Sequence, residues 1–288
     1  CYRRKSDMKA FFIYLLVLTT FCELTLNLCV TGMASTSSRS AYYESTQAHK
    51  QLNETAKNKA ESEGVKFYRT ESASHSTRND GARFDYDSIS TFSSVASAAM
   101  QDYYNQLGMQ TSFNAYSYYG HTPLTAAMFS VKYEFTDNTP SLPTNMTEIG
   151  SQTYSTGNNA ASTVHLYEYN NTLPLGFMVN MSTEANWNKE TGNPFTTQNS
   201  FVKTAIDSDA NIFHQLQTTD TVGTFTAKYQ LEEDDNYKPS GDAATYDVYF
   251  YCVTSSETLT VNITNGSITD DNSTTKTFSS TNQNYICH

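Results

Sequence analysis

The sequence predicts an α+β protein with one N-terminal transmembrane helix, an extracytoplasmic α+β domain and a C-terminal all-β module of sandwich-like type. An apolar run comes first, helical and strand periodicities then mix, and only period-two patterns follow residue 217. We therefore expect a cytoplasmic flank over 1–9, a transmembrane helix over 10–30, an α+β domain over 36–216 and a β module over 217–288. The β module is either complete or truncated at its end.

The apolar run Ala10–Val30 is long enough to cross a bilayer, because about twenty residues at helical rise match the hydrocarbon thickness. Arg3, Arg4, Lys5 and Lys9 precede it, and basic residues of this kind mark the cytoplasmic end of a membrane helix. The expected location is the cell membrane, with the N-terminus cytoplasmic and the bulk of the chain extracellular. The lipid bilayer is then the first partner.

A cleaved signal peptide that begins at Met8, with small residues near 31–34, is the alternative for this run. The run is longer than a usual signal core, and it carries Glu23 near its middle. A carboxyl group at mid-membrane is costly and usually faces other helices rather than lipid. We favour the permanent anchor, and we predict that Glu23 faces the remaining transmembrane helices of a longer protein.

The part beyond the membrane is acidic. Of the 18 Lys and Arg residues four precede the apolar run, and of the 29 Asp and Glu residues only Asp7 and Glu23 lie before its end, which leaves a formal charge of −13. Phosphate neutralisation needs Lys and Arg, so we expect no nucleic acid partner. Electrostatic attachment to anionic lipid is excluded for the same reason.

The α+β domain shows helix and strand patterns in alternation. Gly64 and Gly108 are natural helix stops, and Pro123 suits a first helical turn. The patterns predict helices over 35–64, 92–107, 123–128 and 195–216, strands over 66–69, 129–135 and 162–169, and a turn at 79–81.

The β module alternates apolar and polar residues over 225–231, 246–252 and 259–263, and Asn265-Gly266 supplies a hairpin turn. Cys252 and Cys287 are the cysteines beyond the membrane run, so one disulfide is available. We favour two unpaired thiols over a bridge, because the compartment decides whether disulfides persist.

No catalytic or metal motif is present. The six His residues show no zinc-ligand spacing, and no nucleophile elbow, phosphate loop or dinucleotide fingerprint occurs. We expect no cofactor, no metal and no catalytic residue in this chain. A cluster of rings with nearby amides suits sugar faces, although we favour the interpretation that these rings fill the core. The candidate carbohydrate contacts are Asn114, Tyr116, Tyr118, Tyr119 and His121.

Several segments, taken in order, resemble the YfhO family of bacterial multi-spanning membrane proteins. Their order and spacing across residues 10–205 carry the resemblance, and the β module is similar only in kind. The segments are the apolar helix with Glu23, Phe67–Arg69, Phe84–Ser94, Thr122–Leu124 continuing to Val131–Tyr133, Leu173–Val179, and Asn193–Phe195 with Gln198–Asn199.

This resemblance implies part of a GT-C-like membrane glycosyltransferase, which moves sugar from a polyprenyl-phosphate donor to a cell-envelope polymer such as lipoteichoic acid. The catalytic carboxylate of such enzymes lies on an early extracytoplasmic loop, which this chain does not contain. The chain would be the last core helix and an accessory domain that positions the acceptor glycopolymer, so whether it is itself an enzyme stays open. The alternative is a stand-alone membrane-anchored adhesin or carbohydrate-binding surface protein.

Overall fold

The computed structural model describes residues 2–35, 42–137, 145–157, 160–189, 192–209, 211–214, 217–219, 228–230, 249, 251, 259–263, 274–278 and 286. The chain forms two compact units. The first consists of Cys1–Ser45 with Ser155–Ala160, and the second of Thr46–Tyr154 with Ala161–His288. We refer to the second unit as the head.

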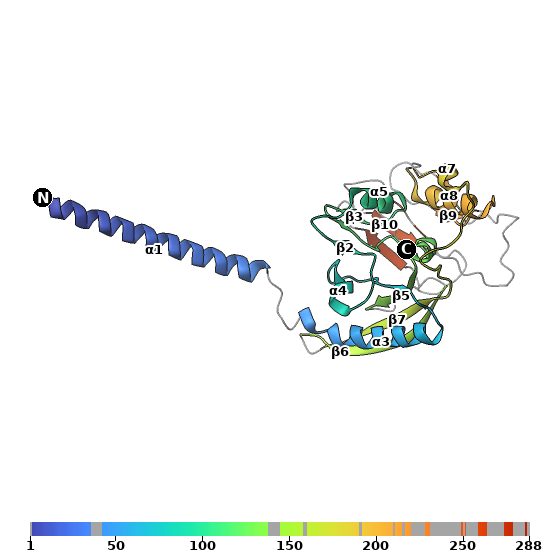
Figure 1. Cartoon of the computed structure of the whole chain (residues 1–288), viewed down its shortest axis with the longest axis horizontal. Helices are drawn as coiled ribbons and strands as arrows, with labels where there is room; N and C mark the ends of the chain where they lie inside the picture. The colour runs from blue at the N-terminus through green and yellow to red at the C-terminus, as the bar shows by residue number, and fades with distance from the viewer. Residues whose placement is uncertain are drawn as a thin grey trace. The chain divides into compact units, whose positions relative to one another are not determined.

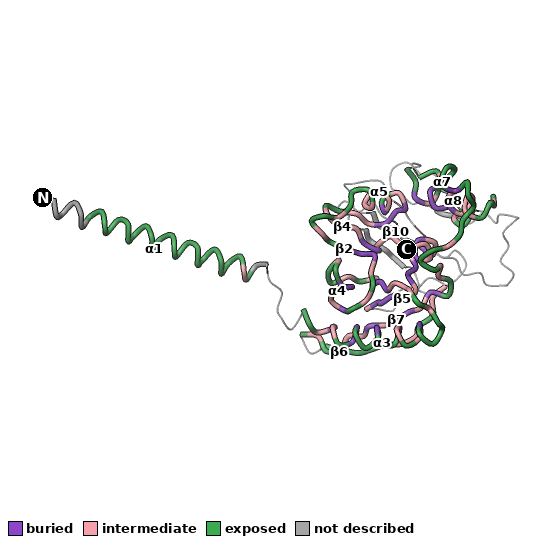
Figure 2. The backbone as a smooth tube through the Cα atoms, in the orientation of Figure 1, coloured by how far each residue is buried: buried purple, intermediate pink, exposed green. Residues whose placement is uncertain are grey.

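The first unit contains the long helix α1, Tyr2–Ser35 (Figure 1). Its stretch Met8–Met33 is long and apolar enough to cross a membrane, and its side chains are exposed along the whole length (Figure 2). Thr19 and Thr25 donate their hydroxyls to carbonyl oxygens one turn back, at 2.9 and 2.8 Å, so these polar groups are satisfied within the helix. The apolar helix predicted over 10–30 is therefore present and extends beyond these bounds at both ends, and its insertion in a membrane stays a prediction.

The head begins with helix α3, Thr46–Ser62. Ala48, Leu52, Ala56 and Ala60 recur every fourth residue and form one buried stripe. The helix is followed by Gly64, which adopts φ +70°, as expected for a residue that ends a helix in the left-handed conformation. The helix predicted over 35–64 is thus confirmed from residue 46 onward, whereas residues 36–41 lie outside the described part.

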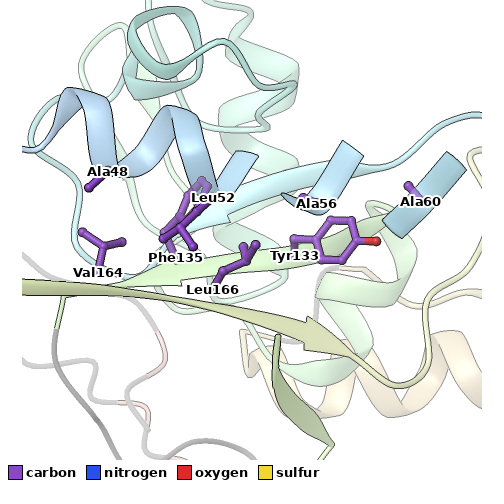
Figure 3. Packing of buried hydrophobic residues seen from close by; sticks show 8 residues of the cluster. All are labelled: Ala48, Leu52, Ala56, Ala60, Tyr133, Phe135, Val164 and Leu166. Carbon is purple, nitrogen blue, oxygen red and sulfur yellow. The ribbon is translucent and has the colours of Figure 1, made fainter. Parts of the chain in front are cut away.

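Helix α3 packs on a four-stranded sheet. The sheet has the order β1-β5-β7-β6, with β1 and β5 parallel and β5 and β7 antiparallel. Figure 3 shows the small and branched side chains of α3 facing those of β5 and β7, which together form one apolar cluster. The strands are β1 (Arg69–Ser72), β5 (Val131–Thr136), β6 (Met146–Ser155) and β7 (Ala161–Tyr169).

Short elements between β1 and β5 surround a second apolar cluster. Four of its large members, Tyr104, Leu107, Met109 and Tyr118, are at most 1 % exposed. A three-stranded sheet of order β2-β4-β3 lies in this region. The elements are α4 (Asp80–Phe84), β2 (Thr91–Phe92), α5 (Ala98–Gln106), β3 (Thr111–Ser112), β4 (Ala115–Tyr116) and α6 (Pro123–Met128).

The rest of the head contains α7 (Thr183–Asn186) and α8 (Pro194–Ile206), then two strand pairs. The antiparallel pairs are β8 (Gln217–Thr219) with β9 (Lys228–Gln230), and β10 (Leu259–Ile263) with β11 (Thr274–Phe278). The strand predicted over 259–263 is confirmed. The sandwich arrangement stays a prediction, and Asn265-Gly266 and both external cysteines lie outside the described residues.

Four predicted elements are wrong in position. The strand placed at 66–69 begins only at Arg69, whose N–H donates to Ser130 O at 2.8 Å, because the chain is still leaving α3 before that point. The turn at 79–81 is instead the start of α4, since the Asp80 carboxylate accepts from the N–H groups of Ser76 and Thr77 at 2.7 and 3.0 Å. Gly81 permits the close approach of Ser88, whose Cβ would lie 2.8 Å from an added methyl group.

The helix predicted from residue 92 begins only at Ala98, where the Ser97 hydroxyl caps it. Phe92 belongs to β2 instead, and it and Val95 are 54 % and 89 % exposed, so the expected apolar stripe is wrong in its first part, although Leu107 at its end is buried. The helix predicted over 195–216 stops at Ile206, because the next residue adopts a left-handed φ of 52°. Strand β6 was not predicted, since few of its residues, Met146, Ile149 and Tyr154, pack on the core.

Gly108 is in contact with Ile286 of the same unit. It adopts φ +80°, and its carbonyl oxygen accepts from the N–H of Ile286 at 2.7 Å. A methyl group at this position would lie 2.7 Å from atoms of Ile286 and Pro194.

We expect Gly108→Ala to lower the free energy of unfolding by about 2–4 kcal/mol, because left-handed strain adds to overpacking. Chemical denaturation of the full chain in detergent, followed by the fluorescence of the single tryptophan Trp187, measures this. Gly176→Ala is the matched control, since Gly176 has no positive φ and no atom within 4 Å of the added methyl group. Equal stability of the two variants would show that the Gly108 contact does not hold the head together.

Candidate functional site

The five candidate carbohydrate contacts lie close together in the chain but not in one pocket. Asn114 adopts a left-handed φ of 56° in the turn between β3 and β4, and Tyr116 of β4 packs its ring 4.7 Å from Tyr104. The Tyr119 hydroxyl accepts from the backbone N–H of His75 at 2.7 Å. The Tyr116 and Tyr119 side chains thus contact other parts of the head, and a role of these residues in sugar contact stays a prediction.

Tyr118 and His121, the other two candidates, belong to a buried polar network. The Tyr118 ring is fully buried and stacks on His121 with 3.8 Å between centroids. The Tyr118 hydroxyl contacts the Tyr169 hydroxyl at 2.8 Å, and Tyr169 in turn donates to Glu134 Oε2 at 2.8 Å. The predicted cluster is therefore connected to a buried carboxylate that the sequence did not single out.

Two glutamates meet inside the head because of the strand register. Glu71 of β1 and Glu134 of β5 are direct partners in the parallel pair, and they are 0 % and 3 % exposed. Each has a histidine neighbour at 3.4 Å, His75 Nε2 beside Glu71 Oε2 and His121 Nε2 beside Glu134 Oε2. We call these four residues the Glu–His cluster.

Glu71 is the structural member of this cluster. One of its oxygens accepts from the Ser88 hydroxyl at 2.6 Å, from the backbone N–H of Ile89 and from that of Ser90 at 3.2 Å. The other accepts from the Ser90 hydroxyl at 2.9 Å. A single carboxylate therefore fixes the segment 88–90, and this satisfies a buried charge that would otherwise be costly.

Glu134 and His121 have opposite pKa shifts with the same main cause. Burial raises the pKa of Glu134 from 4.5 to about 7, against the lowering effect of the tyrosine hydroxyls. Burial also lowers the pKa of His121 from 6.5 to about 4. Near neutral pH His121 is therefore neutral, so its 3.4 Å contact with Glu134 is not an ion pair. Within the described residues no three His, Cys, Asp or Glu side chains have the geometry to hold a metal ion.

A second feature is an open cleft of about 440 Å³ between α3 and α4, which we call the α3–α4 cleft. Rings, an amide, two carboxylates and two amines share its wall. The lining residues are Asn53, Lys57, Lys66, Phe67, Tyr68, Gly81, Ala82, Asp85, Tyr86 and Asp87.

The polar groups of the cleft are held in place from α3. Lys57 Nζ lies 3.1 Å from Asp85 Oδ2 and 3.2 Å from Glu54 Oε1. Asn53 Nδ2 donates to the Asp85 carbonyl oxygen at 2.5 Å, while Asn53 Oδ1 is buried without a hydrogen-bond partner. Asp85 itself adopts a left-handed φ of 66°, a strained conformation for a residue other than glycine. Two lysines and two aspartates line the cleft, so its formal charge cancels.

Sequence analysis missed both features for identifiable reasons. The Glu–His cluster depends on pairing two strands that are far apart in the chain, and a lone Glu inside an apolar strand pattern, such as Glu134 between Tyr133 and Phe135, was its only local signal. The cleft combines residues of α3 with the loops around α4. Glu23 lies within the apolar stretch of α1, as predicted, but its neighbours in a membrane stay a prediction.

Comparison with known proteins gives one match. A family model described as "Bacterial membrane protein YfhO" matches residues 1–286. No curated protein and no solved structure matches the chain.

Proposed function

We propose a function from one established premise: this chain belongs to the YfhO family of bacterial membrane proteins, because the family model covers residues 1–286. Membership of this family suggests a membrane protein related to glycosyltransferases, and helix α1 fits a membrane location. The proposal is that the head is the extracytoplasmic part of such a protein. There it positions the acceptor, a cell-envelope polymer such as lipoteichoic acid, while sugar arrives from a polyprenyl-phosphate donor.

The α3–α4 cleft is the observation that supports this role best. Sugars present apolar C–H faces and many hydroxyls, which suit rings that stand beside amide, carboxylate and amine groups. Phe67 and Tyr68 supply such rings, while Lys66 and Asp87 supply polar groups at the exposed side. Because the charges of the cleft cancel, we expect it to bind a neutral sugar unit of the polymer rather than its phosphates.

The test is the double variant Lys66→Ala/Asp87→Ala, made in the full-length protein in its bacterial host. We expect the sugar content of the envelope polymer to fall by at least about tenfold, since two lost hydrogen bonds to charged groups weaken binding by about 3–6 kcal/mol together, more than a hundredfold in affinity. Sugar on the purified polymer, measured per repeat unit, is the readout. The two side chains are exposed, so the variant should fold normally.

Lys50→Ala is the matched control, because Lys50 is an exposed lysine of α3 that does not line the cleft. Normal sugar content in the cleft variant at normal expression would overturn the proposal. If deletion of the protein leaves the polymer unchanged while the purified chain still binds the glycan, the stand-alone carbohydrate-binding alternative replaces it.

A further inference from the structure

An uncharged loop of the head exposes several large apolar side chains. The loop covers residues 170–182, between β7 and α7, and contains no Asp, Glu, Lys, Arg or His. Met178 and Met181 are both 100 % exposed, and Leu175 and Val179 are 59 % and 40 % exposed. Contiguous apolar side chains that face solvent mark a surface that meets something else.

Hydrogen bonds to α8 fix the backbone at the C-terminal end of the loop, so the fold itself leaves these side chains exposed. The N–H of Asn180 donates to Ala205 O at 2.9 Å, and the Thr183 hydroxyl donates to Thr204 O at 3.0 Å. The Phe177 ring turns inward and packs edge-on against Phe201, with 6.5 Å between centroids. The backbone is therefore held against the end of α8, while the side chains on either side of Phe177 point away from the core.

The end of α8 enlarges the same apolar surface. Ile206 follows Ala205 directly and is 66 % exposed. Methionine and leucine side chains are flexible or branched alkyl groups without hydrogen-bonding demands, so they adapt to a fluid partner. Protein interfaces are enriched in arginine, tyrosine and tryptophan besides methionine and phenylalanine, and residues 170–182 contain none of the first three and no charged side chain that could pair with a protein.

The rest of the chain indicates that the partner of this surface is a lipid bilayer. Helix α1 carries a stretch long and apolar enough to cross a membrane, and the head follows it in the same chain, so a bilayer is the partner that the chain itself supplies. The acidic balance of the chain, −11 overall, disfavours electrostatic attachment to anionic lipid. An uncharged apolar loop is instead suited to the boundary between lipid headgroups and acyl chains.

We propose that the 170–182 loop inserts its apolar side chains into the surface of the bilayer that holds α1. This contact would be a second attachment of the head to the membrane, besides the covalent linker. The inference does not depend on the proposed glycan function, and it assigns a lipid-facing surface rather than an acceptor site.

Methionine oxidation in the native chain tests it without any substitution. The full chain is reconstituted into vesicles of zwitterionic phosphatidylcholine and treated with hydrogen peroxide, and each methionine is followed by mass spectrometry. Met178 and Met181 should oxidise at least about fivefold more slowly than the half-buried Met100 and Met128, the reverse of the order that their exposure in the head dictates. Faster oxidation of Met178 and Met181 than of Met100 would overturn the proposal.

Cross-linking to lipid then separates a bilayer contact from cover by protein. Vesicles that contain a phosphatidylcholine with a photoreactive group on its acyl chain should label the peptide that carries residues 170–182. Met178→Asp/Met181→Asp should abolish this labelling, and Val95→Asp, at a side chain 89 % exposed elsewhere in the head, should leave it unchanged. Protection of the methionines without lipid labelling would mean that protein covers the loop, and the proposal would fail.

Discussion

Replacing Glu71 with alanine is expected to lower the free energy of unfolding of the head by about 3–5 kcal/mol. The carboxylate is fully buried and accepts hydrogen bonds from the Ser88 and Ser90 hydroxyls and from the Ile89 and Ser90 N–H groups. Without it the Ile89 N–H and the Ser90 hydroxyl lose their acceptor, whereas the Ser90 N–H still has Ser88 Oγ at 2.9 Å, and each unsatisfied buried group costs about 1–3 kcal/mol. The loss is comparable to the whole stability of many domains.

The measurement is denaturant unfolding of the full chain in detergent, followed by Trp187 fluorescence. This ring packs 4.9 Å from Phe201 and donates to Thr197 O at 3.0 Å, so its environment changes when the head unfolds. Glu71→Gln keeps one acceptor oxygen and should lie between the wild type and alanine. Glu61→Ala, at an exposed position of α3, should change the stability by less than about 0.5 kcal/mol. Similar midpoints for Glu71→Ala and Glu61→Ala would refute the role given to Glu71.

The second large effect is on the pH dependence of the free energy of unfolding, to which Glu134 and His121 contribute with opposite sign. The pKa of Glu134 is raised to about 7, so its contribution to stability is complete below about pH 4.5 and is lost as the pH rises to about 7. The pKa of His121 is lowered to about 4, so its contribution is complete above about pH 6.5 and is lost as the pH falls to about 4. Each shift corresponds to about 3 kcal/mol, so in the wild type the two nearly offset between about pH 4.5 and 6.5.

Replacing one residue of this pair should therefore expose the pH dependence of stability that the other residue contributes. In Glu134→Gln, which keeps an acceptor for Tyr169, stability should rise by about 3 kcal/mol from pH 4 to 6.5. In His121→Gln it should fall by a similar amount from pH 4.5 to 7. Because the His121 side chain is 20 % exposed and that of Glu134 only 5 %, the histidine effect should be the smaller of the two.

Denaturant midpoints of both variants, measured at half-unit steps of pH and compared with the wild type, check this prediction. All other titrating groups are shared, so the differences isolate the pair. Glu61→Gln controls for the removal of an exposed carboxylate. Two variants whose pH profiles run parallel to that of the wild type would contradict the assigned shifts.

The parts of the fold that sequence reasoning predicted well depend on local chemistry. Helix α6 has the predicted bounds because Thr122 and Thr125 form a capping box ahead of a proline in the first turn. Strand β5 shows its buried alternation at Val131, Tyr133 and Phe135 directly in the sequence. These signals lie within a few residues of the element that they specify.

The parts that could not be predicted depend on contacts between distant segments. Phe92 reads as the start of an amphipathic helix but pairs with Ala115 in a sheet, because tertiary pairing overrides a weak helical pattern. The meeting of Glu71 with Glu134 requires the register of a parallel pair, which no local periodicity encodes. The cleft likewise requires the docking of α3 beside the loop after α4, which places Asn53 next to Asp85.

The parallel pairing of β1 with β5 also orders events during synthesis. Strand β1 leaves the ribosome about sixty residues before β5, a delay of roughly 3–12 s at ordinary rates of elongation. The donors of residues 88–90 follow β1 much sooner, within one nearby loop. Glu71 can therefore form its hydrogen bonds to residues 88–90 before Glu134 has been synthesised. The Glu71 carboxylate then has hydrogen-bond donors before β5 joins the sheet.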